Sequence, residues 1–263
     1  MNQESQNQSF GSFMPQSTQE YAPKKLMSVG ELLSKSWEVY KSRFGSIVGL
    51  MGVSLLLSFL IIGLISGIGV GTGTIFLSGT EIKTTLREWP GFIIIFLFLL
   101  LVGTFLQSWI NASLIYLIKE RGQKIGIKKS LKKGWSVLLS FIWIGFLVGL
   151  RVFGGSLLFI IPGIIFAVWF AFSEYVLIDE GIKGSKALSR SKELVKGFFG
   201  GVLWRLFIIA AIGMIAGFLQ ESVEEQTALS IIIALITIFF LNPFSTIYSF
   251  LLYKNLKRIK TSM

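Results

Sequence analysis

Long apolar runs separated by short lysine-rich segments make up most of this 263-residue chain. A helix needs roughly 20 apolar residues to cross about 30 Å of hydrocarbon. The pattern predicts an all-α fold, a polytopic membrane bundle of six transmembrane helices within a domain covering residues 26–260. The expected spans lie at about 44–66, 91–118, 134–160, 163–178, 198–219 and 228–253.

The third and fourth spans come from one apolar run, residues 134–178, interrupted only by Arg151 and Glu174. As a single helix this run would be about 68 Å long, more than twice the bilayer core. It must therefore fold back. Pro162 and the following Gly163 mark the expected place, since proline breaks a helix and glycine permits a turn.

The charges test this topology independently, because cytoplasmic flanks of membrane helices carry an excess of Lys and Arg. The formal net charge of +11 is concentrated in residues 24–43, 119–133, 179–197 and 254–260. Six spans with an internal N-terminus place all four segments inside and put residues 67–90 and 220–227 outside. The basicity therefore indicates membrane orientation, with cytosolic termini, and not nucleic-acid binding.

The chain begins with a polar stretch, residues 1–25, rich in Gln, Ser and Asn. It lacks the basic start and apolar core of a signal peptide, so we expect a disordered cytosolic tail. Ser28 and Glu31 then fit a capping box at a helix start. One face of that helix carries apolar residues, which favours a helix lying on the membrane or packing on the bundle. These residues are Leu33, Trp37, Tyr40 and Phe44.

An internal repeat links residues 33–45 to residues 188–200 at an offset of 155. The two stretches share Leu, Ser, a base, Ser, Glu, two apolar positions, Lys, Phe and Gly. A weaker copy starts at Ser130. Three hairpins, each entering from the same side after a basic segment, explain the pattern. Chance similarity of lysine-rich helix ends is the alternative.

Composition excludes much chemistry, since the chain has no cysteine and no histidine. Disulfides, thiolate nucleophiles and the commonest general base and metal ligand are absent. Asp179 is the sole aspartate, so an aspartyl dyad is impossible. The glycines at alternate positions from Gly67 to Gly73 follow a span and not a strand, so we expect a flexible or re-entrant turn there. We expect no enzyme, metal or cofactor.

Polar residues within the spans are the candidate functional positions, because a charge at the bilayer centre costs at least about 2.5 kcal/mol. We expect Glu174 to pair with Arg205, and Arg151 to lie near the outer interface. A structural ion pair is one interpretation and a polar substrate or proton pathway is the other. Asn111, like Gln107 and Asn242, is expected to bridge helices more often than to bind ligand.

A basic cluster precedes the third span, formed by Lys128, Lys129, Lys132 and Lys133. Such clusters attract anionic headgroups, with about 1 kcal/mol contributed by each lysine. Membrane orientation alone also explains them.

Several short motifs carry a family resemblance. They are Pro162-Gly163-Ile164, Trp169, Phe172, Val176, Asp179-Glu180-Gly181, Ala187-Leu188-Ser189-Arg190-Ser191, Lys196-Gly197-Phe198, Asn242-Pro243 and residues 252–256. The chain resembles the membrane domain of glycerophosphoryl diester phosphodiesterases and related six-helix families of unknown function. The resemblance implies a prokaryotic inner-membrane protein. Some members carry a catalytic barrel whose chemistry depends on histidines and metal-binding carboxylates. We do not expect that activity here, because the chain has no histidine.

Three functions follow from these observations. The first is a non-enzymatic membrane module, interacting with lipid or acting as a scaffold, in contact with the bilayer and its anionic cytosolic headgroups. The second is a transporter or permease component with a polar pathway around Glu174 and Arg205. A membrane enzyme is a distant third. A protein partner or a homo-oligomer remains open.

Overall fold

The computed structural model describes residues 25–77, 82–120, 125–223 and 227–262, and every regular element within them is a helix. The predicted tail lies outside this part except for Lys25. Six helices are long and apolar enough to cross a membrane, which confirms the predicted fold class. They are Phe44–Ser66, Ile93–Lys119, Ile127–Leu158, Ile160–Glu180, Phe199–Ser222 and Ala228–Thr261.

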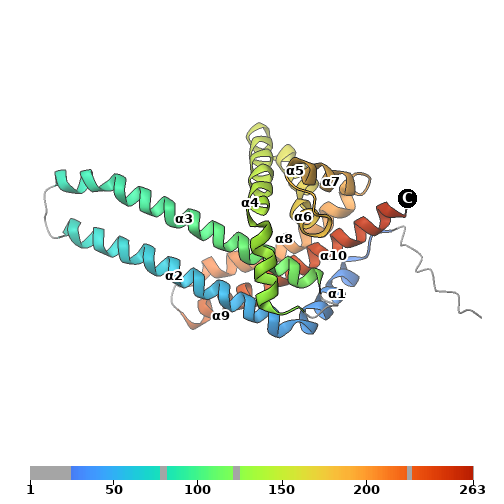
Figure 1. Ribbon diagram of the computed structural model, residues 1–263, viewed down its shortest axis with the longest axis horizontal. Helices are drawn as coiled ribbons and strands as arrows, with labels where there is room; N and C mark the ends of the chain where they lie inside the picture. The colour runs from blue at the N-terminus through green and yellow to red at the C-terminus, as the bar shows by residue number, and fades with distance from the viewer. Residues whose placement is uncertain (1–24, 78–81, 121–124, 224–226, 263) are drawn as a thin grey trace, which may run out of the picture.

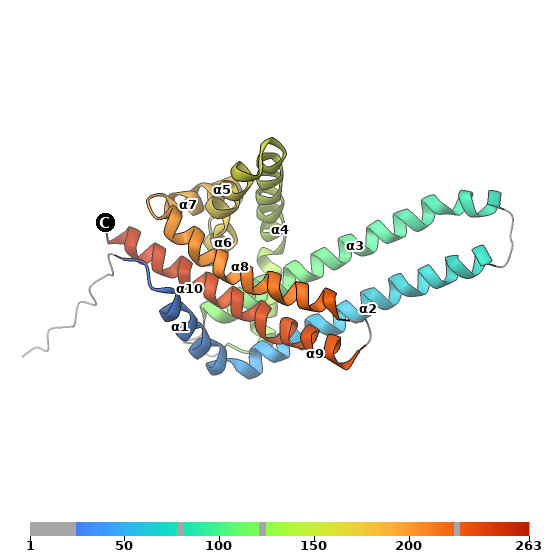
Figure 2. The ribbon, with the colours of Figure 1, turned by 180° about the vertical axis from the view of Figure 1, so that it is seen from behind.

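The helices form three hairpins that diverge from a shared base (Figures 1 and 2). The first pairs α2 (Phe44–Leu77) with α3 (Ile82–Lys119). The second joins α4 (Ile127–Leu158) to α5 (Ile160–Phe170) and α6 (Ser173–Glu180). The third joins α8 (Phe199–Ser222) to α9 (Ala228–Ile236), a π-helical turn (Thr237–Leu241) and α10 (Asn242–Thr261).

The outer parts of the hairpins expose apolar side chains, such as Leu56, Phe153 and Phe218. The described core lies instead at the base, where the largest fully buried side chains include Tyr248, Tyr253 and Phe172. This distribution is typical of a protein whose spans contact lipid, because lipid tails are as apolar as the side chains themselves.

The predicted fold-back is confirmed between α4 and α5. The break falls at Phe159, whose backbone is extended (φ −163°, ψ 155°), and Pro162 lies in the first turn of α5. Proline is tolerated there because its missing N–H would have no helical partner. A Cβ at Gly155 would lie 3.2 Å from the backbone nitrogen of Gly163, so glycine permits the close approach of the two helices.

The glycine-rich segment 67–73 does not form the expected turn, because α2 continues as a helix to Leu77. Each glycine costs only about 1 kcal/mol in a helix. Each added helical residue also gains a backbone hydrogen bond, and this gain outweighs the flexibility of glycine even beyond the apolar span, which ends at Ser66.

The internal repeat appears in the structure as two short amphipathic helices, α1 (Val29–Ser42) and α7 (Ser185–Val195). At the offset of 155, four positions are buried in both helices: Leu32, Ser36, Val39 and Tyr40 in α1, and Ala187, Ser191, Leu194 and Val195 in α7. Equivalent faces therefore pack inward.

The residues of the predicted apolar face differ in burial: Tyr40 is buried and Leu33 is partly buried. Trp37 and Phe44 are 44% and 54% exposed, whereas Ser36 is fully buried. A serine can occupy the buried face because its hydroxyl donates to the carbonyl of Leu32 at 2.6 Å. The predicted N-cap is confirmed, since the Glu31 amide donates to Ser28 Oγ at 3.2 Å.

Candidate functional site

The four lysine-rich segments meet at the base of the hairpins. Arg43, after α1, donates to the carbonyls of Glu120 and Ile125 at 3.1 and 3.2 Å. Lys119, at the end of α3, donates to the carbonyl of Ile178 at 2.7 Å. These contacts place the segments at one end of the molecule, called the basic end below, as the charge pattern predicts.

Asp179 is the hub of this end, and its side chain is only 4% exposed. It accepts from Lys254 at 2.5 Å, from Lys257 at 2.7 Å and from the Tyr253 hydroxyl at 2.9 Å. The sole aspartate of the chain thus fixes α10 against the end of α6. Such a carboxylate, already surrounded by donors, is suited to structure and not to proton transfer.

Glu180 extends the hub to α7 through Arg190, whose Nε lies 3.1 Å from Glu180 Oε2. Burial by itself lowers the pKa of Arg190, but hydrogen bonds and charges from Glu180 and Glu193 raise the pKa above its ordinary value. The guanidinium therefore stays charged and holds α7 to the hub.

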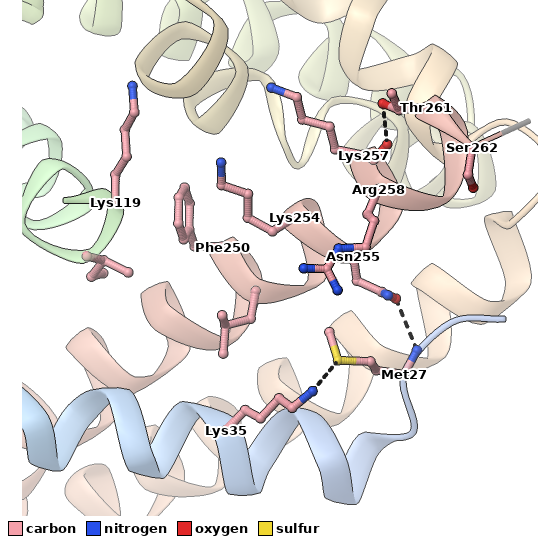
Figure 3. A pocket seen from close by; sticks show the side chains of 12 residues that line it. Met27, Lys35, Lys119, Phe250, Lys254, Asn255, Lys257, Arg258, Thr261 and Ser262 are labelled. Carbon is pink, nitrogen blue, oxygen red and sulfur yellow. Dashed lines mark hydrogen bonds between the residues drawn. The ribbon is translucent and has the colours of Figure 1, made fainter. Parts of the chain in front are cut away.

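A pocket of about 700 Å³ opens at the basic end, between α1, the end of α3 and the C-terminal half of α10 (Figure 3). Its cationic side chains are Lys35, Lys119, Lys254, Lys257 and Arg258. No acidic residue is among its lining, and apolar residues complete the wall: Met27, Ile118, Phe250 and Leu251. The pocket is therefore both basic and amphipathic.

The positive charge of this pocket is only partly neutralised. Lys254 and Lys257 share the single carboxylate of Asp179, and Lys257 also lies 3.4 Å from Glu180. Lys35 is paired with Glu31 at 2.9 Å. The ammonium of Lys119 donates to the carbonyls of Ile178 and Asp179, which carry no formal charge. An anion entering the pocket would meet excess positive charge.

The predicted pair between Glu174 and Arg205 is not formed. Arg205 donates to the carbonyl of Met27 at 2.6 and 2.8 Å and to that of Gly201 at 2.8 Å. Glu174 faces α4, where a Cβ at Gly145 would lie 3.6 Å from its carboxylate. Similar depth in the bilayer suggested the pair, but the guanidinium of Arg205 bonds instead to the carbonyl of Met27, in the segment before α1.

Arg151 packs between α4 and α5. Its guanidinium carbon lies 5.5 Å from the ring centroid of Phe170, within cation–π range. Its Nη1 is buried and has no hydrogen-bond partner among the described residues. The structure thus gives Arg151 an aromatic partner that the sequence did not indicate.

The lysine cluster forms the first two turns of α4, and it divides. Lys133 pairs with Glu120, whereas Lys128, Lys129 and Lys132 are exposed. None of these four lysines lines the basic pocket. The pocket has no signature in the local sequence, because its cations come from three helices far apart in the chain.

The amide residues behave in different ways. Gln107 bridges α3 to α2 as predicted, accepting from Ser54 Oγ at 3.2 Å. Asn111 is exposed and lines a second, uncharged cavity with Gln107 and Asn242. This cavity lies within the spans.

By length and composition of its helices, the chain is a multi-pass membrane protein. No protein-family model, curated protein or solved structure matches it. No group of three or more acidic side chains that could hold a metal ion occurs within the described residues.

Proposed function

We propose that this protein is a non-enzymatic membrane module that binds anionic lipid headgroups at its basic end. The observation that carries the proposal is the basic pocket, in which five cationic side chains surround an apolar wall. Basic pockets between membrane helices on the cytoplasmic side bind phosphate headgroups. The positive-inside rule favours a cytosolic position for this end, and the family resemblance implies the inner membrane.

The shape of the pocket matches the chemistry of a phospholipid. A phosphate would contact Lys119 and Lys254, while the first acyl carbons would lie against Ile118 and Phe250. Both lysines are anchored by α6, through the Ile178 carbonyl and Asp179 respectively. The ligand-binding groups are thus held in place before the lipid arrives, which lowers the entropy cost of binding.

The test is binding of phosphatidylglycerol to the full chain in phosphatidylcholine nanodiscs, counted by native mass spectrometry. The double variant Lys35→Gln/Lys119→Gln removes two pocket charges and should weaken saturable binding about 30-fold, at about 1 kcal/mol for each lysine. The matched control Lys128→Gln/Lys129→Gln removes the same charge outside the pocket. It should weaken saturable binding less than the pocket variant does, because neither lysine lines the pocket.

Equal losses in the two double variants would contradict the proposal and leave only general surface attraction. Absence of saturable phosphatidylglycerol binding would contradict it as well. Circular dichroism of each variant confirms that the helices are intact.

A transporter role is the second candidate, favoured by the carboxylate of Glu174 within a span. Ionisable residues inside membranes mark substrate or proton pathways more often than other positions do. Solute or proton flux into liposomes that Glu174→Gln abolishes, with folding unchanged, would establish this role.

A further inference from the structure

A second cavity, of about 340 Å³, lies between α2, α3 and the start of α10. It sits near the middle of the spans, since Ser54 is far from both ends of Phe44–Ser66 and Gln107 from both ends of Ile93–Lys119. Its wall is mainly hydroxyl and carboxamide groups, and no charged residue lines it. A polar site at this depth is costly unless a ligand or water satisfies it.

The hydrogen bonds already made by the lining residues determine which groups a ligand must offer. Each hydroxyl has one hydrogen, and those of four lining residues are already donated within the protein. Ser58 donates to the Ser54 carbonyl, Ser54 to Gln107, and Ser245 and Thr246 to the Asn242 carbonyl. These oxygen atoms offer only lone pairs, so the ligand must donate to them.

The carboxamide side chains that line the cavity supply hydrogen-bond donors. The NH₂ groups of Gln107 and Asn111 are donors, so the ligand must also accept. Hydroxyl groups both donate and accept, which suits this wall. An ion does not suit it, because an ion without a counter-charge at this depth carries a large desolvation cost.

The backbone at the cavity departs from regular helix. The π-helical turn Thr237–Leu241 comes directly before Asn242 and Pro243. Proline cannot donate the next helical hydrogen bond, which accounts for the irregularity. Single π turns occur frequently at functional sites, and broken helices frame midplane binding sites in membrane proteins.

An apolar groove of about 270 Å³ adjoins the cavity and shares Ser54, Ser58 and Gln107 with it. The groove runs between α2 and α3 along Ile61 and Gly103. A Cβ at Gly103 would lie 3.6 Å from Ile61 Cδ1, so glycine keeps this space open. The groove is suited to an acyl chain attached to a group in the cavity.

We propose that the cavity binds an uncharged glycerol-type hydroxyl group, either free glycerol or the head of an acylglycerol whose chain occupies the groove. This site is separate from the basic pocket and differs from it in ligand charge. The two sites share no lining residue. The proposal therefore does not depend on anionic lipid binding.

The experiment measures equilibrium binding of radiolabelled 1-monooleoylglycerol, and separately of glycerol, to the full chain in phosphatidylcholine nanodiscs, with empty nanodiscs subtracted. Gln107→Leu leaves ligand hydroxyls unpaired and should weaken binding of the occupant at least about tenfold. Asn111→Leu is the second variant, since Asn111 is exposed and its loss spares the fold. Gln220→Leu in α8 is the matched control and should bind as the unaltered protein does.

Gly103→Leu, which fills the groove, distinguishes the two sources, with Gly149→Leu in open space on α4 as its control. Monooleoylglycerol binding weakened by both Gln107→Leu and Gly103→Leu assigns an acylglycerol. Glycerol binding weakened by Gln107→Leu and unchanged by Gly103→Leu assigns the free polyol. Absence of saturable binding for both probes, or saturable binding unchanged in Gln107→Leu and Asn111→Leu, overturns the proposal.

Discussion

Asp179→Asn removes the single negative charge to which Lys254 and Lys257 are both bonded. The aspartate side chain is 4% exposed, and breaking a fully buried ion pair costs about 3–5 kcal/mol. The lysines are 42% and 31% exposed, so their uncompensated charges can hydrate. Exposed pairs contribute only about 0.2–1 kcal/mol. The expected loss lies between these limits, at about 2 kcal/mol of unfolding free energy.

The assay is reversible unfolding in mixed detergent–SDS micelles, followed by circular dichroism. Glu31→Gln is the matched control, because it removes a carboxylate from an exposed pair with Lys35 that is 2.9 Å long. That change should cost no more than about 0.5 kcal/mol. If Asp179→Asn unfolded as the control does, the carboxylate would not hold α10 to α6.

The same variant makes an opposite prediction for binding. Asp179→Asn weakens the anchoring of Lys254 but leaves the basic pocket one charge more positive. We expect the gain in charge to outweigh the lost anchoring, so phosphatidylglycerol should bind at least as tightly while the fold weakens. Opposite signs in the two assays separate the structural role of the aspartate from the binding role of the lysines. Parallel losses would indicate that the lysines bind lipid only while Asp179 positions them.

Two further predictions concern helix packing, both measured by the same unfolding assay. Gly134→Ala would place a Cβ 2.9 Å from the backbone nitrogen of Ser113, so it should destabilise the fold by about 1–3 kcal/mol. The control Gly149→Ala, in open space, should be neutral or stabilising. Equal effects of the two variants would contradict the close α3–α4 contact. Ser191→Ala removes two hydrogen bonds to the backbone at the α5–α6 junction and should cost about 1–2 kcal/mol of unfolding free energy. The equivalent Ser36→Ala removes one hydrogen bond within its own helix and should cost less than about 0.5 kcal/mol. A larger cost for Ser36→Ala than for Ser191→Ala would contradict this account.

Local sequence was sufficient for the spans, because the bilayer imposes a fixed length and apolar character on each crossing segment. The fold-back near Pro162 and the clustering of the basic segments follow from the same constraint. The break falls at Phe159 and not at the proline, since a helix accepts proline within its first turn. Such a shift of a few residues depends on packing between α4 and α5.

The internal repeat shows which features local sequence predicts and which depend on tertiary packing. Sequence spacing indicated that α1 and α7 are equivalent, but it did not indicate which residues of α1 are buried. Trp37 and Phe44 are exposed, whereas Ser36 is buried and its hydroxyl donates to the Leu32 carbonyl within the helix. Burial of a small polar residue is decided by its hydrogen bond, which a hydropathy pattern does not contain.

What the sequence by itself determined is therefore the all-α fold and the number and approximate place of the membrane helices. Tertiary structure alone decided the partner of Arg205, the Asp179 hub and both cavities. The physical reason is that a span is a property of consecutive residues, whereas a site depends on how helices rotate and cross. Lys35, Lys119 and Lys254 share a pocket only because α1, α3 and α10 meet at the basic end.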